Sequence, residues 1–546
     1  MFLPHWRERA WQRLGDPVDV LIIGGGITGA GILHDAALRG LSAALVEQGD
    51  FGCGTSSRSS KLIHGGLRYL KKMQLRITRT ACRERDLLAV SSPHLVWKTR
   101  FLYPSYRQDK TPGWQVALGL TMYDHLTAVR HRHERVEADE VRAWYPQVAH
   151  RGLEFGLLYD DAAADDARLV HAVVQAGVLA GGAALSYARV EELVRDAERH
   201  VIGAVVRDLE TDLTHRVIAR VVVNATGVWC DQVRALLGGV AARLRPSRGS
   251  HLLFPRERLP VEVAVTGLSP DDGRPVFTVP HPEGTLVGTT DLFHSGALED
   301  PRPSAEEAGY LLRFAQAVFP GARLSYGDIS GAFAGVRPIL DSTAETPSEA
   351  SREEEVWVED GLVSTAGGKL TTFRATAEEV VDQVLKLLPE GRGEAAEPVA
   401  TAGAALPWRV DPAEAGESLQ RLGARSDVAA GMVRRLGAMA LAAAGVADAD
   451  DLKPVAEGLD LCAAELAWHL RFGGVVRLED LLLRRVRIGM WQPRRTLELA
   501  PRLRPLLRRA AGWSVPRWNR ELEGLERAVA NWLPPERPAP SGRRSR

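Results

Sequence analysis

The feature that most constrains this chain is a glycine-rich turn near its start, between a buried strand and a helix. Residues 19–23 (DVLII) are apolar and rich in β-branched side chains, and they run directly into GGGITG at 24–29. Residues 30–39 then predict a helix, and residues 41–46 predict a second strand that ends at Glu47. This order predicts a βαβ unit that binds a dinucleotide.

Three glycines and one acid give this turn its chemistry. Gly24 permits the tight turn, Gly26 lets the backbone approach a pyrophosphate, and Gly29 allows close helix packing. The helix N-terminus offers N–H groups and positive potential, and Glu47 can accept hydrogen bonds from ribose hydroxyls. The pattern alone does not separate NAD from FAD. The hydroxyl-rich stretch at 52–70 then replaces a further βα unit, and it suits an extended dinucleotide with ribityl hydroxyls.

Two later segments repeat the order of strand, loop and helix. Residues 217–223 lead into NATG and a helix to about 237, and residues 362–365 lead into AGGKLTT and a helix to about 388. Short alternating strands are predicted between them, at 250–254, 276–279 and 285–289, and the turn at 282–284 predicts a hairpin. We therefore expect an antiparallel sheet inserted into the nucleotide-binding domain.

Length and cysteine content limit the class of protein. The 546 residues are too many for one compact core and predict two to four domains. Four cysteines lie far apart and form no CxxC pair, so we expect reduced thiols and neither a disulfide framework nor a metal cluster. Neither a signal peptide nor a membrane-spanning helix is expected, because residues 169–188, the longest uncharged stretch, contain histidine, glutamine and glycines.

Charge is unevenly distributed although the net charge is zero. Residues 51–135 contain 16 Lys and Arg against 5 Asp and Glu. Such a segment favours an anionic partner, such as a phosphate, a pyrophosphate or an acidic lipid surface, and a solvated basic face is the alternative. No motif supports nucleic-acid binding.

A set of motifs in this sequence resembles the membrane-associated FAD-dependent glycerol-3-phosphate dehydrogenases. They span residues 18–380 in the order of that family, with a weaker match at 478–489. The motifs are GGGITGAG, GTSSRSSKLIHGGLRYL, PHLVWKTRFLYP, GLTMYDHL, NATGVW, RGSH, GTTD, GVRP and GGKLTTFR. The resemblance implies FAD as cofactor, sn-glycerol 3-phosphate as substrate and quinone as electron acceptor.

The resemblance also implies site residues. Substrate contacts are expected from Arg68, Tyr69, Arg337, Arg352 and Lys369. Cofactor contacts are expected from Gly24, Gly26, Ile27, Thr28, Gly29, Glu47, Thr55, Ser56, Ser60, Leu62, Val190, Ala225, Gly227, Gly368, Lys369, Leu370 and Thr371. No metal site is expected.

The expected catalytic residues are His251, Arg337 and Lys369, and these three also stand out by their chemistry. Only 8 of the 69 basic residues are lysine, so Lys369 at a glycine-rich helix entrance can stabilise an anionic flavin or a phosphate. Arg337 can bind phosphate or polarise a substrate oxygen, and a surface ion pair is the alternative. Loss of a hydride from a secondary alcohol also needs a base. His251 matches the family histidine, His64 competes with it, and a structural hydrogen bond is the alternative role.

We predict an α/β chain with a glutathione-reductase-like FAD-binding domain over 1–400 and a helical domain over 401–546 that ends in a disordered basic tail. An antiparallel substrate sheet is inserted at roughly 80–150 and 245–350. We expect a cytoplasmic protein, peripheral on the inner face of the cell membrane. Its interfacial surface would come from two N-terminal sets and two further segments, unless the N-terminal helix packs on the core: Phe2, Leu3, Trp6 and Trp11, then Arg7, Arg9 and Arg13, and residues 68–85 and 97–123.

Other functions stay open at this point. An oxidase that uses oxygen, an amine or amino-acid oxidase, and a non-catalytic FAD-binding protein share parts of the pattern. The basic surplus and GGKLTTFR argue against the amino-acid oxidase, and the residues implied for the site argue against a non-catalytic protein. The oligomeric state is also open, with a homodimer as one option.

Overall fold

The computed structural model describes residues 2–66, 74–127, 132–340, 346–347, 354–389, 406 and 408–537. Its first part is a mostly parallel eight-stranded sheet in the order β17-β18-β10-β1-β2-β7, with β8 and β9 continuing from β10. The strands are β1 (Val18–Ile23), β2 (Ala43–Val46), β7 (Ala183–Leu185), β8 (Ala188–Arg195), β9 (Val201–Asp208), β10 (Thr214–Asn224), β17 (Glu355–Glu359) and β18 (Leu362–Ala366).

The register of this sheet brings several strand ends together. Ile23 pairs with Val46 and with Asn224, and Asn224 pairs with Ser364. Helices α2 (Ile27–Leu38), α7 (Asp166–Leu179) and α10 (Phe373–Leu387) pack together beside the sheet. The buried strand β1 is fully apolar except for Asp19, which is why it lies at the centre of the sheet.

The second sheet has ten strands and is mostly antiparallel. Its hairpin between β13 and β14 pairs His281 with Gly284, as the turn at 282–284 predicted. The strands are β3 (Leu62–Ile63), β4 (Val96–Tyr106), β5 (Glu134–Glu137), β6 (Leu153–Ala164), β11 (Ser247–Phe254), β12 (Ala264–Leu268), β13 (Pro275–His281), β14 (Gly284–Gly288), β15 (Leu292–Phe293) and β16 (Gly331–Arg337).

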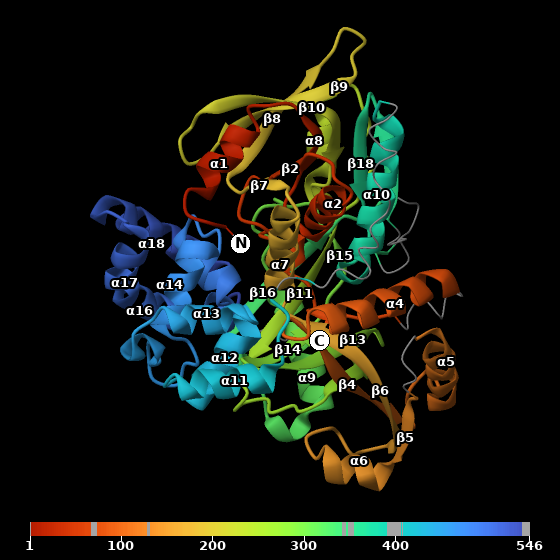
Figure 1. The fold of residues 1–546 in the computed structure, drawn as a ribbon. Helices are drawn as coiled ribbons and strands as arrows, with labels where there is room; N and C mark the ends of the chain where they lie inside the picture. The colour runs from red at the N-terminus through yellow and green to blue at the C-terminus, as the bar shows by residue number, and fades with distance from the viewer. Residues whose placement is uncertain are drawn as a thin grey trace, which may run out of the picture.

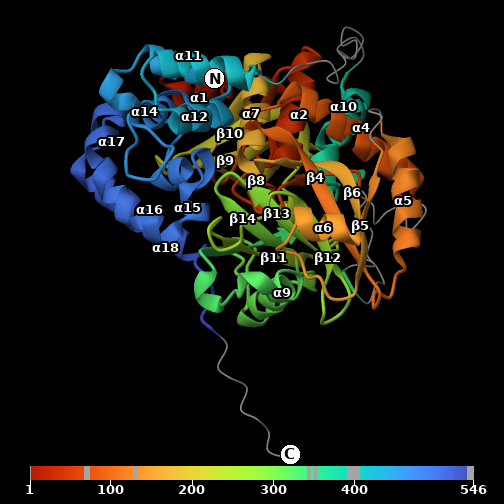
Figure 2. The ribbon, with the colours of Figure 1, turned by 90° about the horizontal axis from the view of Figure 1, so that it is seen from below.

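Further helices lie around the two sheets. Figure 1 and Figure 2 both show α4 and α5 side by side at one edge of the molecule. These helices are α1 (Trp6–Arg13), α4 (Leu75–Ser91), α5 (Gly113–Leu126), α6 (Ala138–Trp144), α8 (Cys230–Ala235) and α9 (Ala305–Val318). Single 3-10 turns occur at Thr55–Ser57, Gly227–Trp229, Pro320–Ala322, Tyr326–Asp328 and Leu370–Thr372.

The C-terminal region is helical and gathers on one side of the molecule in both views. Leu253 and Phe333 of the second sheet share a core with Leu481 and Trp491, so these helices pack directly on that sheet. The elements are α11 (Pro412–Arg421), α12 (Ser426–Leu436), α13 (Met439–Gly445), α14 (Ala463–Phe472), α15 (Ile488–Trp491), α16 (Pro493–Leu499), α17 (Arg504–Ala511) and α18 (Val515–Ala530), with short helical turns at Ala449–Leu452, Asp480–Arg485 and Ala500–Leu503. The predicted α/β class with a helical C-terminal region is confirmed.

The N-terminal residues pack on the core, which was one of the two predicted alternatives. Phe2 is 2% exposed and stacks on Phe51. The Trp11 indole donates a hydrogen bond to Asp208 and its ring stacks on His215. The expectation that Phe2 contributes to an interfacial surface was therefore wrong, because its side chain is buried, and Trp11 is half-buried against Asp208 and His215. Within the described ranges, no helix is both long enough and apolar enough to cross a bilayer.

Candidate functional site

A cavity of about 380 Å³ opens where β1, β2, β10 and β18 end. In a parallel sheet this edge is the usual place for a ligand, because the loops that follow the strands converge there. Five segments line the cavity: 23–28, 46–59, 188–190, 225–236 and 365–370, together with Pro338.

The glycine-rich turn has a geometry that only glycine allows at two positions. Gly24 has φ +109°, and a Cβ there would lie 2.7 Å from the carbonyl oxygen of Ala225. A Cβ on Gly29 would collide with the carbonyl oxygen of Gly24. The N-terminus of α2 therefore lies directly below the turn, and Ile27 N donates to Ser56 Oγ at 3.0 Å. This arrangement fits a bound pyrophosphate.

Glu47 is oriented by the backbone around it. Its Oε2 accepts a hydrogen bond from Gly25 N at 2.6 Å, and its Oε1 accepts one from Gly49 N at 2.7 Å. Burial raises the pKa of Glu47, and these two N–H groups oppose the shift. Each carboxylate oxygen can accept a further hydrogen bond, so Glu47 fits the ribose of a dinucleotide.

The cavity brings together most of the residues predicted to contact the cofactor. Those that line it are Gly24, Gly26, Ile27, Thr28, Glu47, Thr55, Ser56, Val190, Ala225, Gly227, Gly368, Lys369 and Leu370. Gly29, Ser60, Leu62 and Thr371 are not among its lining residues. The donors at α2, the acceptor Glu47 and the hydroxyl-rich wall fit FAD. No group of three or more metal-ligating side chains occurs in the described part of the chain.

His251 lies on β11 beside this cavity rather than in its wall. Its Nε2 shares a 2.9 Å hydrogen bond with Ser60 Oγ, and its ring stacks on Phe333 at 4.7 Å. Its Nδ1 has no hydrogen-bond partner among the described residues. Burial lowers the pKa of His251 well below 6.5, helped by the charges of Arg337 and Lys61. His251 is therefore a neutral imidazole at neutral pH.

The two predicted basic residues lie in different surroundings. Arg337 ends β16, and its guanidinium contacts Asp291 Oδ1 and Thr289 Oγ1, both at 3.1 Å. Lys369 lines the cavity, and its charge acts on Glu354. The surface ion pair considered for Arg337 is instead a pair with a buried carboxylate, since Asp291 is 4% exposed. Arg68, Tyr69 and Arg352 lie outside the described residues.

His64, the competing base, lies between the two sheets. Its backbone N–H donates a hydrogen bond to Thr371 Oγ1 at 3.2 Å. The Thr371 hydroxyl also donates to the His64 carbonyl at 3.4 Å. His64 is therefore held against the turn at 369–371, next to the cavity.

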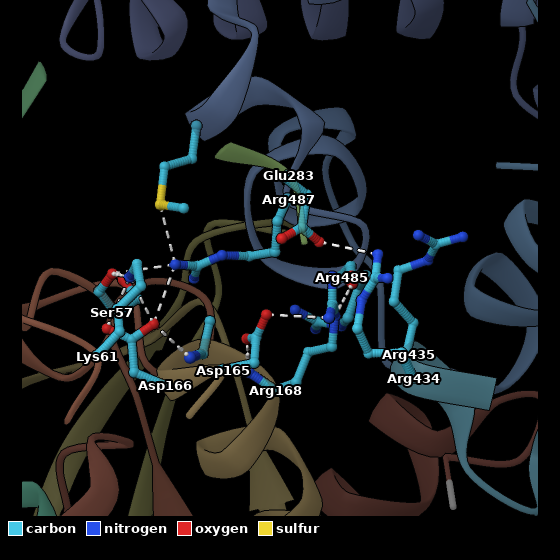
Figure 3. Close-up of polar contacts among 12 residues, drawn as sticks. Ser57, Lys61, Asp165, Asp166, Arg168, Glu283, Arg434, Arg435, Arg485 and Arg487 are labelled. Carbon is cyan, nitrogen blue, oxygen red and sulfur yellow. Dashed lines mark hydrogen bonds and ion pairs between the residues drawn. The ribbon is translucent and has the colours of Figure 1, made fainter. Parts of the chain in front are cut away.

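Sequence reasoning missed a buried ionic cluster behind the hydroxyl-rich stretch (Figure 3). Lys61 Nζ donates to both oxygens of Asp166 at 2.8 and 2.9 Å, and Arg487 Nη2 donates to Asp166 Oδ1 at 3.0 Å. Burial lowers the pKa of Lys61 to about 8. Lys61 could have been found, because it is one of only 8 lysines and lies within a quoted motif. Asp166 and Arg487 are 321 residues apart, and no sequence signal joins them.

Comparison with known proteins places this geometry in a family. The family described as FAD dependent oxidoreductase matches residues 19–383, and the C-terminal domain of alpha-glycerophosphate oxidase matches residues 398–517. The aerobic glycerol-3-phosphate dehydrogenase of Bacillus subtilis (strain 168) is 38% identical over 376 residues, which are 68% of this chain and 67% of that protein. The chain belongs to the family of FAD-dependent glycerol-3-phosphate dehydrogenases.

Other relatives support the assignment. The aerobic glycerol-3-phosphate dehydrogenase of Staphylococcus aureus (strain USA300) is 37% identical over 73% of both chains. The structure of a glycerol-3-phosphate dehydrogenase from Bacillus halodurans complexed with FAD has a TM-score of 0.81 and 28% identity, over 98% of this chain and 99% of that one. The predicted family membership and the predicted FAD cofactor are confirmed, and the chain is an FAD-dependent enzyme.

Proposed function

We propose that this enzyme oxidises sn-glycerol 3-phosphate to dihydroxyacetone phosphate and passes the electrons to quinone at an anionic membrane surface. The observation that carries the proposal is the position of Lys369, a rare lysine in this chain, in the wall of the cavity that fits FAD. A cation there can stabilise an anionic reduced cofactor or the phosphate of the substrate. When bound, FAD supplies a two-electron acceptor for the hydride from C2.

The chain's own residues would bind the substrate and hold the proton. Arg337 has a guanidinium that Asp291 and Thr289 keep in one orientation, and it would bind the phosphate together with Arg68 and Lys369. His251 would accept the hydroxyl proton as a neutral imidazole. A phosphate dianion close to Arg337 would offset only the part of the lowering of the His251 pKa that comes from the cations, and burial, its largest cause, would still keep the imidazole neutral.

Anaerobic mixing of the oxidised holoenzyme with sn-glycerol 3-phosphate tests the substrate. We expect rapid loss of flavin absorbance, and a far slower loss with glycerol, which lacks the phosphate. Comparable rate constants for the two substrates would contradict the proposed phosphate site. Acid precipitation should release the FAD into the supernatant, since no histidyl or cysteinyl attachment pattern accompanies the fingerprint.

Oxygen is the second candidate for the electron acceptor. The observation that favours it is the match of residues 398–517 to the C-terminal domain of alpha-glycerophosphate oxidase. Reoxidation of the reduced enzyme by air and by a soluble quinone analogue separates the two acceptors. We expect the quinone analogue to be faster by at least tenfold, with little hydrogen peroxide. Stoichiometric peroxide would favour the oxidase.

The membrane surface would be formed by α4 and α5, which lie side by side (Figure 1, Figure 2). On α5, Trp114 is 64% and Leu118 is 56% exposed, one helical turn apart. On α4, Arg76, Arg79 and Arg83 are exposed. Apolar side chains beside arginines suit the headgroup region of an anionic bilayer.

Sedimentation with anionic and with neutral vesicles tests this surface. We expect binding to anionic vesicles that weakens but persists at high salt. Trp114→Ala combined with Leu118→Ala should reduce it at least tenfold, whereas Trp144→Ala, at an exposed tryptophan on α6, should not. Equal binding by both variants would contradict the location. Light scattering of the same samples would determine whether the enzyme is a homodimer.

A further inference from the structure

The backbone at Gly65 is held by a side chain from a surface helix. Gly65 N donates to Tyr123 Oη at 2.7 Å, and the same N–H lies 3.4 Å from Asp161 Oδ1. Tyr123 belongs to α5 and Asp161 to β6. A Cβ on Gly65 would collide with Tyr123 Oη and Cys82 Sγ, so the packing leaves no room for the segment to shift towards α4 or α5.

The hydrogen bonds around Tyr123 have a fixed direction. Burial raises the pKa of Tyr123 well above 10, so its hydroxyl keeps its proton. That proton is donated to Asp161 Oδ1 at 2.8 Å, and the oxygen of the hydroxyl therefore accepts from Gly65 N. Arg85 Nη1 donates to Asp161 Oδ1 at 2.7 Å and to Tyr123 Oη at 3.2 Å. Arg85 thus supports both acceptors.

The other face of the same segment contacts the cofactor side of the site. His64, directly before Gly65, is paired through its backbone N–H and carbonyl with Thr371 Oγ1. Thr371 follows Lys369 and Leu370, which line the cavity. The segment 64–65 is therefore clamped between Tyr123 on one side and the turn at 369–371 on the other.

We propose that Tyr123 is a positioning residue for the reaction, with Asp161 and Arg85 behind it. It lies outside the cavity lining. It acts by fixing the position of the His64–Gly65 backbone relative to the turn that carries Lys369. Loss of the hydroxyl would leave the Gly65 N–H with only the longer contact to Asp161. A small displacement of the segment then reaches Lys369 through Thr371, and displacements of this kind lower rates strongly. This inference relies on the proposed function only for the choice of substrate.

Tyr123→Phe in the full-length holoenzyme is the first test. We expect the rate constant of anaerobic flavin reduction by sn-glycerol 3-phosphate to fall by about 10- to 100-fold, with FAD still bound. Tyr159→Phe is the matched control, because it also removes one buried hydroxyl, which bonds Thr266 at 2.9 Å, from a tyrosine of the second sheet. We expect this control to retain the rate constant within twofold. Equal rate constants for both variants and the wild type would overturn the proposal.

A double-mutant cycle with Thr371→Val locates the pathway. If Tyr123 acts through the His64–Gly65 backbone, the fold-losses of Tyr123→Phe and Thr371→Val should multiply to more than the loss of the double variant. Tyr159→Phe with Thr371→Val should show simple multiplication. Simple multiplication in both cycles would overturn the proposed pathway.

Hydrogen exchange gives a readout that needs no substrate. Peptides covering 62–66 should exchange at least tenfold faster in Tyr123→Phe than in Tyr159→Phe. This result together with no flavin reduction in any variant would refute the proposed substrate and leave the positioning role standing. Unchanged exchange would overturn the positioning role. If Tyr123→Phe fails to fold, Arg85→Lys keeps the charge but withdraws the Nη1 group that donates to Tyr123 Oη and Asp161 Oδ1, and the same increase in exchange is expected.

Discussion

Two buried aspartates hold the same stretch of chain, residues 57–66, by different means. Asp166, at the start of α7, is bound by the cations Lys61 and Arg487 and by Ser59 Oγ at 2.8 Å. Asp161, near the end of β6, is bound by one cation, Arg85, and by Tyr123. The Asp166 side joins the stretch to the C-terminal helical region, and the Asp161 side joins it to α4 and α5.

The two aspartates therefore hold different parts of the candidate active site. Ser60, which bonds His251, lies in the half that Asp166 fixes, and His64 lies next to the half that Asp161 fixes. Two cations and full burial give the first half a rigid ionic anchor. In the second half, Gly65 N makes its shorter hydrogen bond to Tyr123 Oη, and removal of this one hydroxyl leaves only the 3.4 Å contact to Asp161 Oδ1. The C-terminal region therefore contributes directly to the architecture of the candidate active site.

Replacement of His251 and of His64 tests this comparison with the largest expected effect. We expect His251→Asn to lower kcat by about 10² to 10⁴-fold, if the base lies on the Asp166 side. His64→Asn is the matched variant on the Asp161 side and should cost less than tenfold. Stopped-flow flavin reduction measures both. The reverse order would move the base to His64.

Removal of the ionic anchor should have the next largest effect. Asp166→Asn leaves Lys61 and Arg487 buried without their carboxylate, so we expect the free energy of unfolding to fall by about 3 to 5 kcal/mol. Asp161→Asn leaves only Arg85 and should cost less. Denaturant unfolding at one fixed FAD concentration compares them. Equal losses would contradict the view that the two anchors differ in kind.

Glu47 contacts neither of the two aspartates, so its replacement should change FAD binding alone. Glu47→Ala is expected to weaken FAD binding by about 1 to 3 kcal/mol, the range for a hydrogen bond to a charged group. Hydrogen exchange of residues 57–66 in the FAD-saturated variant should stay as in the wild type. Glu134→Ala, at an exposed carboxylate paired with Arg100, is the control. Unchanged FAD affinity in Glu47→Ala would remove this residue from the site.

The smallest expected effect is on the pH profile. The folded-state pKa of His251 is lowered, so the imidazole stays neutral as the pH falls through 6.5, where an ordinary histidine would gain a proton. We expect kcat to change by less than about twofold between pH 7.5 and 6.0. Saturating substrate is needed, because a phosphate monoester itself titrates near pH 6. An acid limb with a midpoint near 6.5 would point to a solvent-exposed base.

Stability against unfolding should also depend on pH, because other buried histidines have lowered pKa values. Burial lowers the pKa values of His34, His94 and His281 to about 4, so at these three positions the unfolded chain binds more protons than the folded chain below pH 6.5. Stability is therefore expected to fall as the pH drops from 6.5 towards 4. Thermal unfolding across this range measures the decline.

Local patterns were enough to predict much of the fold. The strand at 19–23, the glycine turn and the hairpin at 282–284 are encoded by neighbouring residues, and the structure has them as β1, the start of α2 and the turn between β13 and β14. The helix at 30–39 begins earlier, at Ile27, because the turn leads into helical backbone without a separate loop. The roles of the individual site residues and the domain boundaries stay predictions.

By itself, the sequence determined the dinucleotide fold, the family and the cofactor, because these depend on short motifs whose residues act within a few positions of each other. Only the tertiary structure decided that Phe2 is buried, that His251 bonds Ser60, and that Arg337 faces a buried carboxylate. It also decided the two aspartate anchors. Their partners are separated by up to 321 residues, and burial together with chain topology, rather than any local pattern, brings such charges together.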